Sequence, residues 1–359
     1  MTGRKIGSLF FGCMGILILI LDAATACSGA SEGVELCIRT VIPSLFPFLV
    51  LSVCVIGPLA SFSCKWLRPI GKVLHLPENA ETIFLIGLLG GYPVGAQCIR
   101  QAYDAGALSR ADAQRMLRFC SNAGPAFLFG IGGHLFGDQR LCMLLWLVHI
   151  LSAVVIGMLT PPAETSVRSV LQIPHISLTE AVRRSSGVMA SICSWIVLFR
   201  ILLSFLEKWF FWMLPQPIDL LFCGILELAN GSTALMNLQV PEYRFVLFST
   251  MLGFGGLCVG LQTNAILSGT SLSIRPYFLG KLAHGALSCI MSILLIQILP
   301  GGSGVQFGSI WLIPPAMIFT LYILFCRNHK MRIAFRRKMM YTEHKSPGGI
   351  TYEAISQKS

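Results

Sequence analysis

Charged residues are scarce in this sequence, and their scarcity excludes most soluble folds. Only 12% of its 359 residues are charged, 54% are hydrophobic, and the mean hydropathy is +0.72. A typical soluble domain carries about 25% charged residues. We therefore expect an all-α, polytopic membrane protein whose main partner is the lipid bilayer.

Motifs for catalysis and metal binding are also missing. The 13 cysteines stand singly, without a C-x-x-C pair or a histidine spacing suited to zinc. The sequence specifies no Ser-His-Asp set, carboxylate pair or phosphate-binding loop. We therefore expect no enzyme activity, no metal and no cofactor. The formal net charge of +11 does not indicate a nucleic acid partner, because lysine and arginine lie in short links and in the tail.

The most informative stretch is an apolar run, beginning at Ile83, that glycine and proline interrupt. Gly90, Gly91, Pro93 and Gly95 follow one another within six residues. A helix broken there exposes backbone groups that hydrocarbon cannot satisfy, so the break must pack in protein or line a watery cavity. A second apolar run is interrupted by Ser-Asn-Ala-Gly-Pro at residues 121–125. Two interrupted segments in tandem favour a site for a polar solute.

Basic residues predict which links are cytoplasmic. Residues 65–72 and 100–118 are both rich in lysine and arginine, which favours the cytoplasmic side for each. The segment between them, from about Glu81 to Tyr103, then enters and leaves on one side as a re-entrant hairpin. Arg275 and Lys281 mark a further cytoplasmic link. We expect both termini in the cytoplasm.

The two halves of the chain share a plan. LVHILSAVVIGML, with His149, resembles LAHGALSCIMSIL, with His284, and the phrases GLLGGYPVG and SNAGPAFLFG match GILELANGS and GFGGLCVGLQ in the same order. Charges make the corresponding spans run in opposite directions. This predicts about eight transmembrane helices and two broken, re-entrant hairpins in two inverted repeats. In the second half we expect a break at Gly231 and Ser232 and another in the glycine-rich run after Phe245.

The expected organisation follows from these spans. A link with Glu32 and Glu35 separates the first span from a second at about Val41 to Leu59. The first segment is an uncleaved span, with a signal peptide as the alternative. The full division is residues 1–30 first span, 31–160 repeat 1, 161–183 cytoplasmic linker, 184–300 repeat 2, 301–326 final span and 327–359 basic tail.

Several phrases together resemble one family. LFPFLVLS, GGYPVGAQ, FCSNAGPAF, LELANG and GFGGLCVGLQ look like the YlbJ-type sporulation integral membrane proteins, within the wider nucleoside-recognition Gate domain group. The resemblance covers most of the chain. It implies a protein of a bacterial cytoplasmic membrane with a role in spore formation, and it implies a permease for nucleoside-like solutes. The high cysteine content departs from the family and alters none of these phrases.

The chemistry we expect is binding. Glu227 is the only carboxylate well inside an apolar run of the second half, and such a group is costly enough in a membrane to indicate function. It binds solute or carries a proton, or else it forms a fixed ion pair with Arg200. For the polar groups near the breaks, the alternative role is hydrogen bonding between helices. The candidate solute-binding residues are Gly91, Tyr92, Pro93, Gly95, Gln97, Ser121, Asn122, Glu227, Asn230 and Gln262.

The function we predict is transport. A small polar solute would bind near the bilayer midplane, where the breaks of both repeats converge, so that Gly91 and Asn122 lie near Glu227, Asn230 and Gln262. The alternative is a non-transporting membrane protein that assembles the spore coat or cortex through its basic tail. The sequence does not define a coupling ion, and a homo-oligomer is a further expectation.

Overall fold

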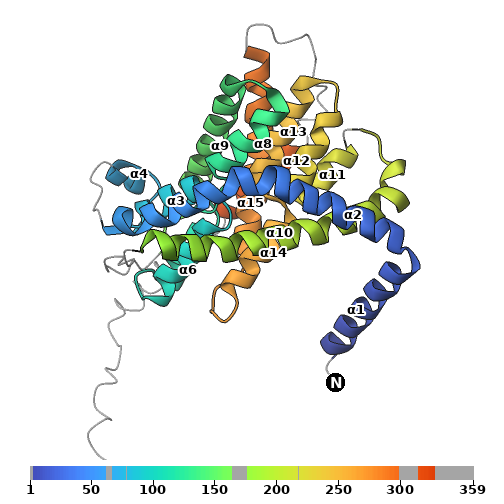
Figure 1. Ribbon diagram of the computed structural model, residues 1–359. Coiled ribbons are helices and arrows are strands. Elements are labelled where there is room, and N and C mark those ends of the chain that lie inside the picture. The colour runs from blue at the N-terminus through green and yellow to red at the C-terminus, as the bar shows by residue number, and fades with distance from the viewer. Residues whose placement is uncertain are drawn as a thin grey trace, which may run out of the picture.

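The computed structural model describes residues 3–61, 67–77, 79–163, 176–216, 218–298 and 314–327. Every secondary-structure element in these ranges is a helix (Figure 1). Five described helices are long and apolar enough to cross a membrane: Ala23–Leu51, Gln139–Leu159, Leu178–Trp209, Pro241–Leu267 and Arg275–Ile298. The all-α, multi-pass membrane class is thereby confirmed. Most of the predicted linker and nearly all of the basic tail lie outside the described residues.

The region predicted to be a link before the second span is part of one long helical unit. After α1 (Gly3–Leu21), α2 (Ala23–Leu36) continues through the π-helical turn η1 (Cys37–Val41) into α3 (Ile42–Ser61). The predicted link at Glu32 and Glu35 was wrong. Both carboxylates are helical and paired, Glu35 with Arg39 one turn later at 3.0 Å and Glu32 with Arg200 at 2.9 Å. Ion pairing therefore lets these charges stay within a helix.

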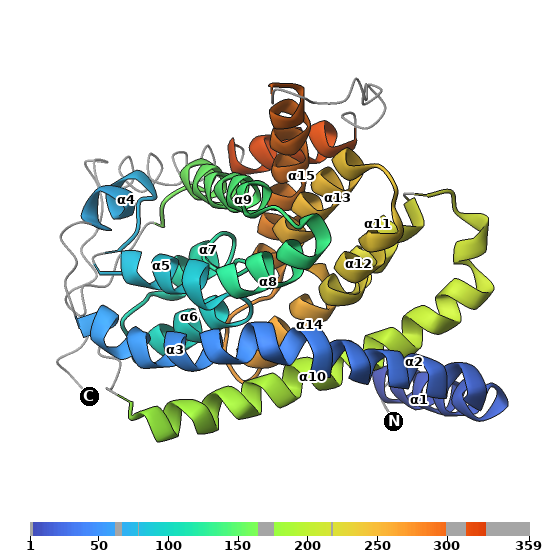
Figure 2. The same ribbon diagram turned by 45° about the horizontal axis from the view of Figure 1, so that its top comes forward.

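Helix α10 (Leu178–Trp209) runs antiparallel to the continuous rod of α2 and α3 and lies alongside it across the molecule (Figures 1 and 2). Small residues set their spacing. A Cβ atom at Gly33 would lie 2.9 Å from the Cα atom of Val197, so only glycine fits this contact. Arg200 then joins α10 to α2, because it binds both Glu32 and Glu207.

The first half contains the predicted hairpin. After α4 (Arg68–Val73), α5 (Glu81–Gly90) and α6 (Val94–Asp104) pack together and are separated by a break at residues 91–93. The second apolar run, at about Met116 to Phe136, is interrupted as predicted, but it is not a full transmembrane span. The structure has a short α7 (Arg110–Met116), an irregular stretch, and the 12-residue α8 (Pro125–Phe136). At 1.5 Å per residue α8 is about 18 Å long, which is too short to cross a bilayer core of about 30 Å.

The second half places its first break differently from the prediction. Helix α11 (Ile218–Leu226) ends before Glu227, and α12 (Leu228–Ala234) contains Gly231 and Ser232. Gly231 serves packing: a Cβ atom there would lie 2.2 Å from the Cα atom of Gly224, so α12 can fold back closely on α11. After α12, the short turn η4 (Leu235–Asn237) leads to α13 (Pro241–Phe254) and α14 (Gly256–Leu267). Gly255 and Gly256, both with positive φ, separate α13 from α14.

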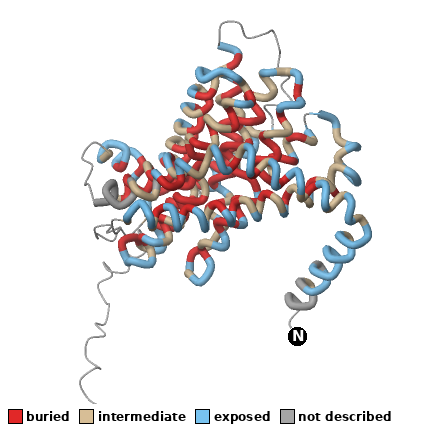
Figure 3. Tube along the Cα trace, viewed as in Figure 1, coloured by how far each residue is buried: buried red, intermediate tan, exposed pale blue. Residues whose placement is uncertain are grey.

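The two halves meet in the buried centre. Helices α5 to α8 lie to one side and α11 to α14 to the other, with α9 (Gln139–Leu159) and α15 (Arg275–Ile298) between them (Figure 2). Matching histidines contact each other: the rings of His149 and His284 stack 4.5 Å apart, and His284 Nε2 donates to the His149 carbonyl at 3.1 Å. Contact between equivalent residues is what a two-fold relation between the halves produces. Buried residues concentrate around this contact, whereas α1 projects away and is exposed (Figure 3).

Candidate functional site

The helix breaks of both halves surround one cavity of about 60 Å³. Helices α3 and α10 line its remaining wall, partly through Leu45 and Ile196. This volume holds a few water molecules and is far below the roughly 300 Å³ minimum of pockets for drug-sized ligands. As it stands, the cavity is too small for a drug-sized ligand. Its lining from the breaks consists of Gly90, Gly91, Tyr92, Ala123, Gly124, Glu227, Leu228, Ala229, Val259 and Gln262.

Backbone-to-backbone packing holds the breaks of the first half together. Gly91 has a φ of 74°, which favours glycine, and a Cβ atom at Gly124 would lie 2.9 Å from the Gly91 Cα atom. Cβ atoms at Gly87 and Gly95 would lie only 1.8 and 2.2 Å from the Cys120 carbonyl oxygen. The glycines thus allow α5 and α6 to close over the irregular stretch before α8. Gly95 fills a packing role and does not line the cavity.

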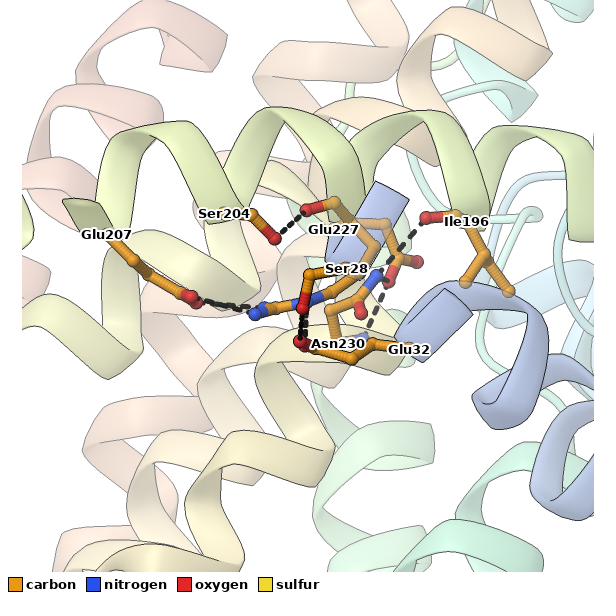
Figure 4. A network of polar contacts seen from close by, with 8 residues as sticks. Ser28, Glu32, Ile196, Ser204, Glu207, Glu227 and Asn230 are labelled. Atoms are coloured by element: carbon orange, nitrogen blue, oxygen red, sulfur yellow. Dashed lines mark hydrogen bonds and ion pairs between the residues drawn. The ribbon is translucent and has the colours of Figure 1, made fainter. Parts of the chain in front are cut away.

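Glu227 is the buried carboxylate of the cavity wall. Its side chain is 3% exposed and caps α12: Oε1 accepts from Ala229 N at 3.0 Å, and Oε2 accepts from Asn230 N and Nδ2 at 2.6 and 2.8 Å. Asn230 also donates to the Ile196 carbonyl of α10 at 3.4 Å (Figure 4). The capping explains why the helix breaks here, since a carboxylate at this position satisfies N–H groups that the new helix leaves open.

The predicted alternative, an ion pair between Glu227 and Arg200, is wrong. Arg200 bonds to both carboxylate oxygens of Glu207, at 2.8 and 2.7 Å, and to Glu32 at 2.9 Å. Figure 4 shows Glu32 and Glu207 apart from the contacts between Glu227 and Asn230. Glu227 is therefore held by backbone amides and an asparagine, and it has no ion pair among the described residues.

Lys281 is a buried basic residue, although we expected it in a cytoplasmic link. It lies inside α15 and is 0% exposed. Its Nζ contacts Tyr92 Oη at 3.2 Å, Asn122 Oδ1 at 3.2 Å and His284 Nδ1 at 3.3 Å. Its ammonium also lies 5.1 Å from the centre of the Tyr92 ring. A lysine three residues before His284 in an apolar run was the available signal, since both side chains share one helix face.

The hydrogen-bond partners of Lys281 bear on whether its side chain is an ammonium or a neutral amine. Tyr92 Oη donates its proton to the Leu252 carbonyl, and His284 donates from Nε2, which leaves Nδ1 as an acceptor. Asn122 donates from Nδ2 to the Phe119 carbonyl, so its Oδ1 faces Lys281 as an acceptor. An ammonium can donate to all three groups, whereas a neutral amine can bind all three only if Tyr92 Oη donates to it instead of to Leu252. The geometry therefore favours an ammonium behind Tyr92, one side chain away from the cavity, and this remains a prediction.

The structure divides the ten predicted site residues into groups. Gly91, Tyr92, Glu227 and Gln262 line the central cavity, and Pro93 and Gln97 line an outer cavity together with Gln262. Asn122 and Asn230 stand behind the wall, where they bind Lys281 and Glu227. Ser121 is buried, and its hydroxyl has no hydrogen-bond partner among the described residues. The breaks thus converge as predicted, but the two asparagines support the wall instead of facing the cavity.

Comparison with known proteins gives one informative match. No protein-family model and no solved structure matches the chain. The chain is 25% identical, over 312 residues, to the sporulation integral membrane protein YlbJ of Bacillus subtilis (strain 168). The match covers 74% of this chain and 76% of that protein. This similarity supports a YlbJ-type assignment of the chain.

Proposed function

We propose that this protein transports a small polar, nucleoside-like solute across the membrane during sporulation and binds it in the central cavity. The observation that carries the proposal is the convergence of helix breaks from both halves on one cavity that contains Glu227. Sporulation enters through the name of the similar Bacillus subtilis protein.

The physical basis is the free-energy cost of the open backbone groups in the wall of the central cavity. Each open backbone group costs several kcal/mol if it faces hydrocarbon. Continuous helices would avoid that cost, so broken ones favour a functional reason. A buried carboxylate and a buried lysine add to the cost, and ionisable groups at such depth mark solute or ion pathways. Glu227 is our candidate for contact with the solute, and Lys281 for holding Tyr92 in the wall.

The small cavity volume defines what transport would require. A cavity of about 60 Å³ is too small for a nucleoside. The helix ends at the breaks must therefore move apart before the solute binds. The contact between Gly91 and Gly124 is made by glycine backbones without interlocking side chains. Opening there would uncover backbone N–H and C=O groups that a polar solute can bind.

Uptake by purified protein in liposomes tests the proposal. Nucleosides, amino acids and organic acids are offered separately, and we expect uptake of one class that Glu227→Gln abolishes. Glu35→Gln is the matched control, because Glu35 is exposed on α2 and pairs only with Arg39 among the described residues. No uptake of any class, by protein that remains folded, would contradict transport.

The charge pattern supports a cytoplasmic location for both termini and for residues 100–118. Reporter fusions would test this orientation. A reporter at residues 100–118 that is found outside would remove both the re-entrant hairpin and the inversion of the repeats.

A further inference from the structure

A second, larger cavity lies on the outside of the central one. Its volume is about 720 Å³, within the range of small-molecule sites. It opens to the surface between α6, α10 and α14, which lie next to one another in Figure 1. Its wall carries hydrogen-bonding and aromatic side chains, among them Gln97, Ser191 and Trp195.

The charged residues that line this outer cavity are one glutamate and two arginines, so one net positive charge remains. Arg183 and Arg184 both bind Glu180, at 2.8 and 2.7 Å. The guanidinium groups are thus already occupied by a carboxylate. The amide, hydroxyl and indole groups of the wall suit a polar solute with a planar ring, which can stack on Trp195.

Only two side chains belong to both cavities. Ile192 of α10 and Gln262 of α14 line the central cavity and the outer one, and they are 9% and 8% exposed. Gln262 is also held along its own helix, because its Nε2 donates to the Sγ atom of Cys258, one turn earlier in α14, at 3.4 Å. The hairpin tip contributes to the same partition, since Tyr92 lines the inner cavity and Pro93 the outer one. A layer one side chain thick therefore separates the two spaces.

We propose that the outer cavity is the vestibule through which the solute reaches the central cavity, and that Ile192 and Gln262 form the gate. The inference rests on the proposed transport function and adds its route. The vestibule has room for a solute of nucleoside size, which the smaller central cavity lacks. Movement of the Ile192 and Gln262 side chains would join the central and outer cavities without a rearrangement of the helices.

A thiol placed behind the gate tests the route without any knowledge of the solute. Ala229 lines the central cavity and not the outer one. The variant Ala229→Cys in lipid nanodiscs is treated with sulfonatoethyl methanethiosulfonate, whose charge keeps it out of hydrocarbon. Tandem mass spectrometry that assigns the adduct to residue 229, and not to the native Cys223 nearby in the sequence, gives the rate of modification.

Gate variants should change this rate in opposite directions. Ile192→Trp fills the passage and should slow modification by about tenfold, equivalent to about 1.4 kcal/mol in the free energy of access. Gln262→Ala removes the side chain across the passage and should speed modification by a similar factor. Leu198→Trp is the matched control, because Leu198 lies on the same helix with 56% exposure and lines neither cavity.

The outcomes separate the route from transport itself. Unchanged rates in both gate variants, relative to Leu198→Trp, would overturn the gate, and Gln262→Ala alone decides if Ile192→Trp does not fold. Rates that follow the gate while no solute is taken up would leave the route standing and remove transport. Uptake that persists while modification ignores the gate would keep transport and overturn the route.

Discussion

Replacing Asn122 with leucine should show that Lys281 is held as an ammonium. The substitution keeps the side-chain shape but removes Oδ1, one of the three acceptors around Nζ. A hydrogen bond to a charged group contributes about 1.5–3 kcal/mol, and a buried unpaired N–H of a cation adds to the loss. The bond from Asn122 to the Phe119 carbonyl is lost as well. A single variant therefore mixes two effects.

A double-mutant cycle isolates the contact with Lys281. In a Lys281→Met background, Asn122→Leu still loses the bond to Phe119 but no longer leaves an ammonium unpaired. The two substitutions should therefore couple by about 1.5–3 kcal/mol in the free energy of unfolding. Equilibrium unfolding of the four proteins in mixed micelles measures this coupling. Ser121→Ala is the control partner, because its hydroxyl is buried without a described hydrogen bond. Effects of Asn122→Leu and Lys281→Met that add within about 0.5 kcal/mol would refute the ammonium assignment.

Three further predictions concern separate parts of the fold. Gly87→Ala should greatly reduce the amount of folded protein in membranes, because its Cβ atom would lie 1.8 Å from the Cys120 carbonyl oxygen. Gly133→Ala is the control and should not reduce it, because the space around Gly133 is open. Gel filtration in detergent measures the folded fraction. Arg200→Gln should lower the unfolding temperature, because it removes the ion pair between α10 and α2, and uptake per folded molecule should persist. Loss of uptake in fully folded protein would contradict the separation of Arg200 from Glu227. Deleting residues 328–359 should leave uptake in liposomes intact, and a sporulation defect that accompanies normal uptake would favour the rival assembly function.

Helix breakage was readable from the sequence, but its exact place was not. Glycine and proline clusters predicted the break at Gly91, because several helix-breaking residues within one turn and a half disfavour a continuous helix. In the second half the same logic chose Gly231, whereas the chain breaks at Glu227. A helical glycine that permits close packing and a glycine that ends a helix look alike in a sequence. Only the three-dimensional contact with Gly224 distinguishes them.

The positions and partners of the buried charged residues were also only partly predictable from the sequence. Glu227 was identified because a carboxylate far from any other charge stands out in an apolar run. Lys281 was missed because Arg275 is nearby, and counting both charges placed them together in a link. Arg200 was assigned the wrong partner, since its carboxylates come from α2 and from two turns further along α10. Pairing across helices depends on their packing, which charge patterns do not contain.

Protection of two cysteines by one solute tests the central claim most directly. Ala126 in the first half and Ala229 in the second both line the central cavity, whereas Asn122 and Asn230, which were expected to bind the solute, stand behind its wall. Ala126→Cys and Ala229→Cys are each modified with a small polar thiol reagent while the transported solute is titrated. One shared site predicts that the solute protects both cysteines with the same half-maximal concentration. Protection of only one of them, or of neither while uptake proceeds, would contradict a single cavity formed by both halves.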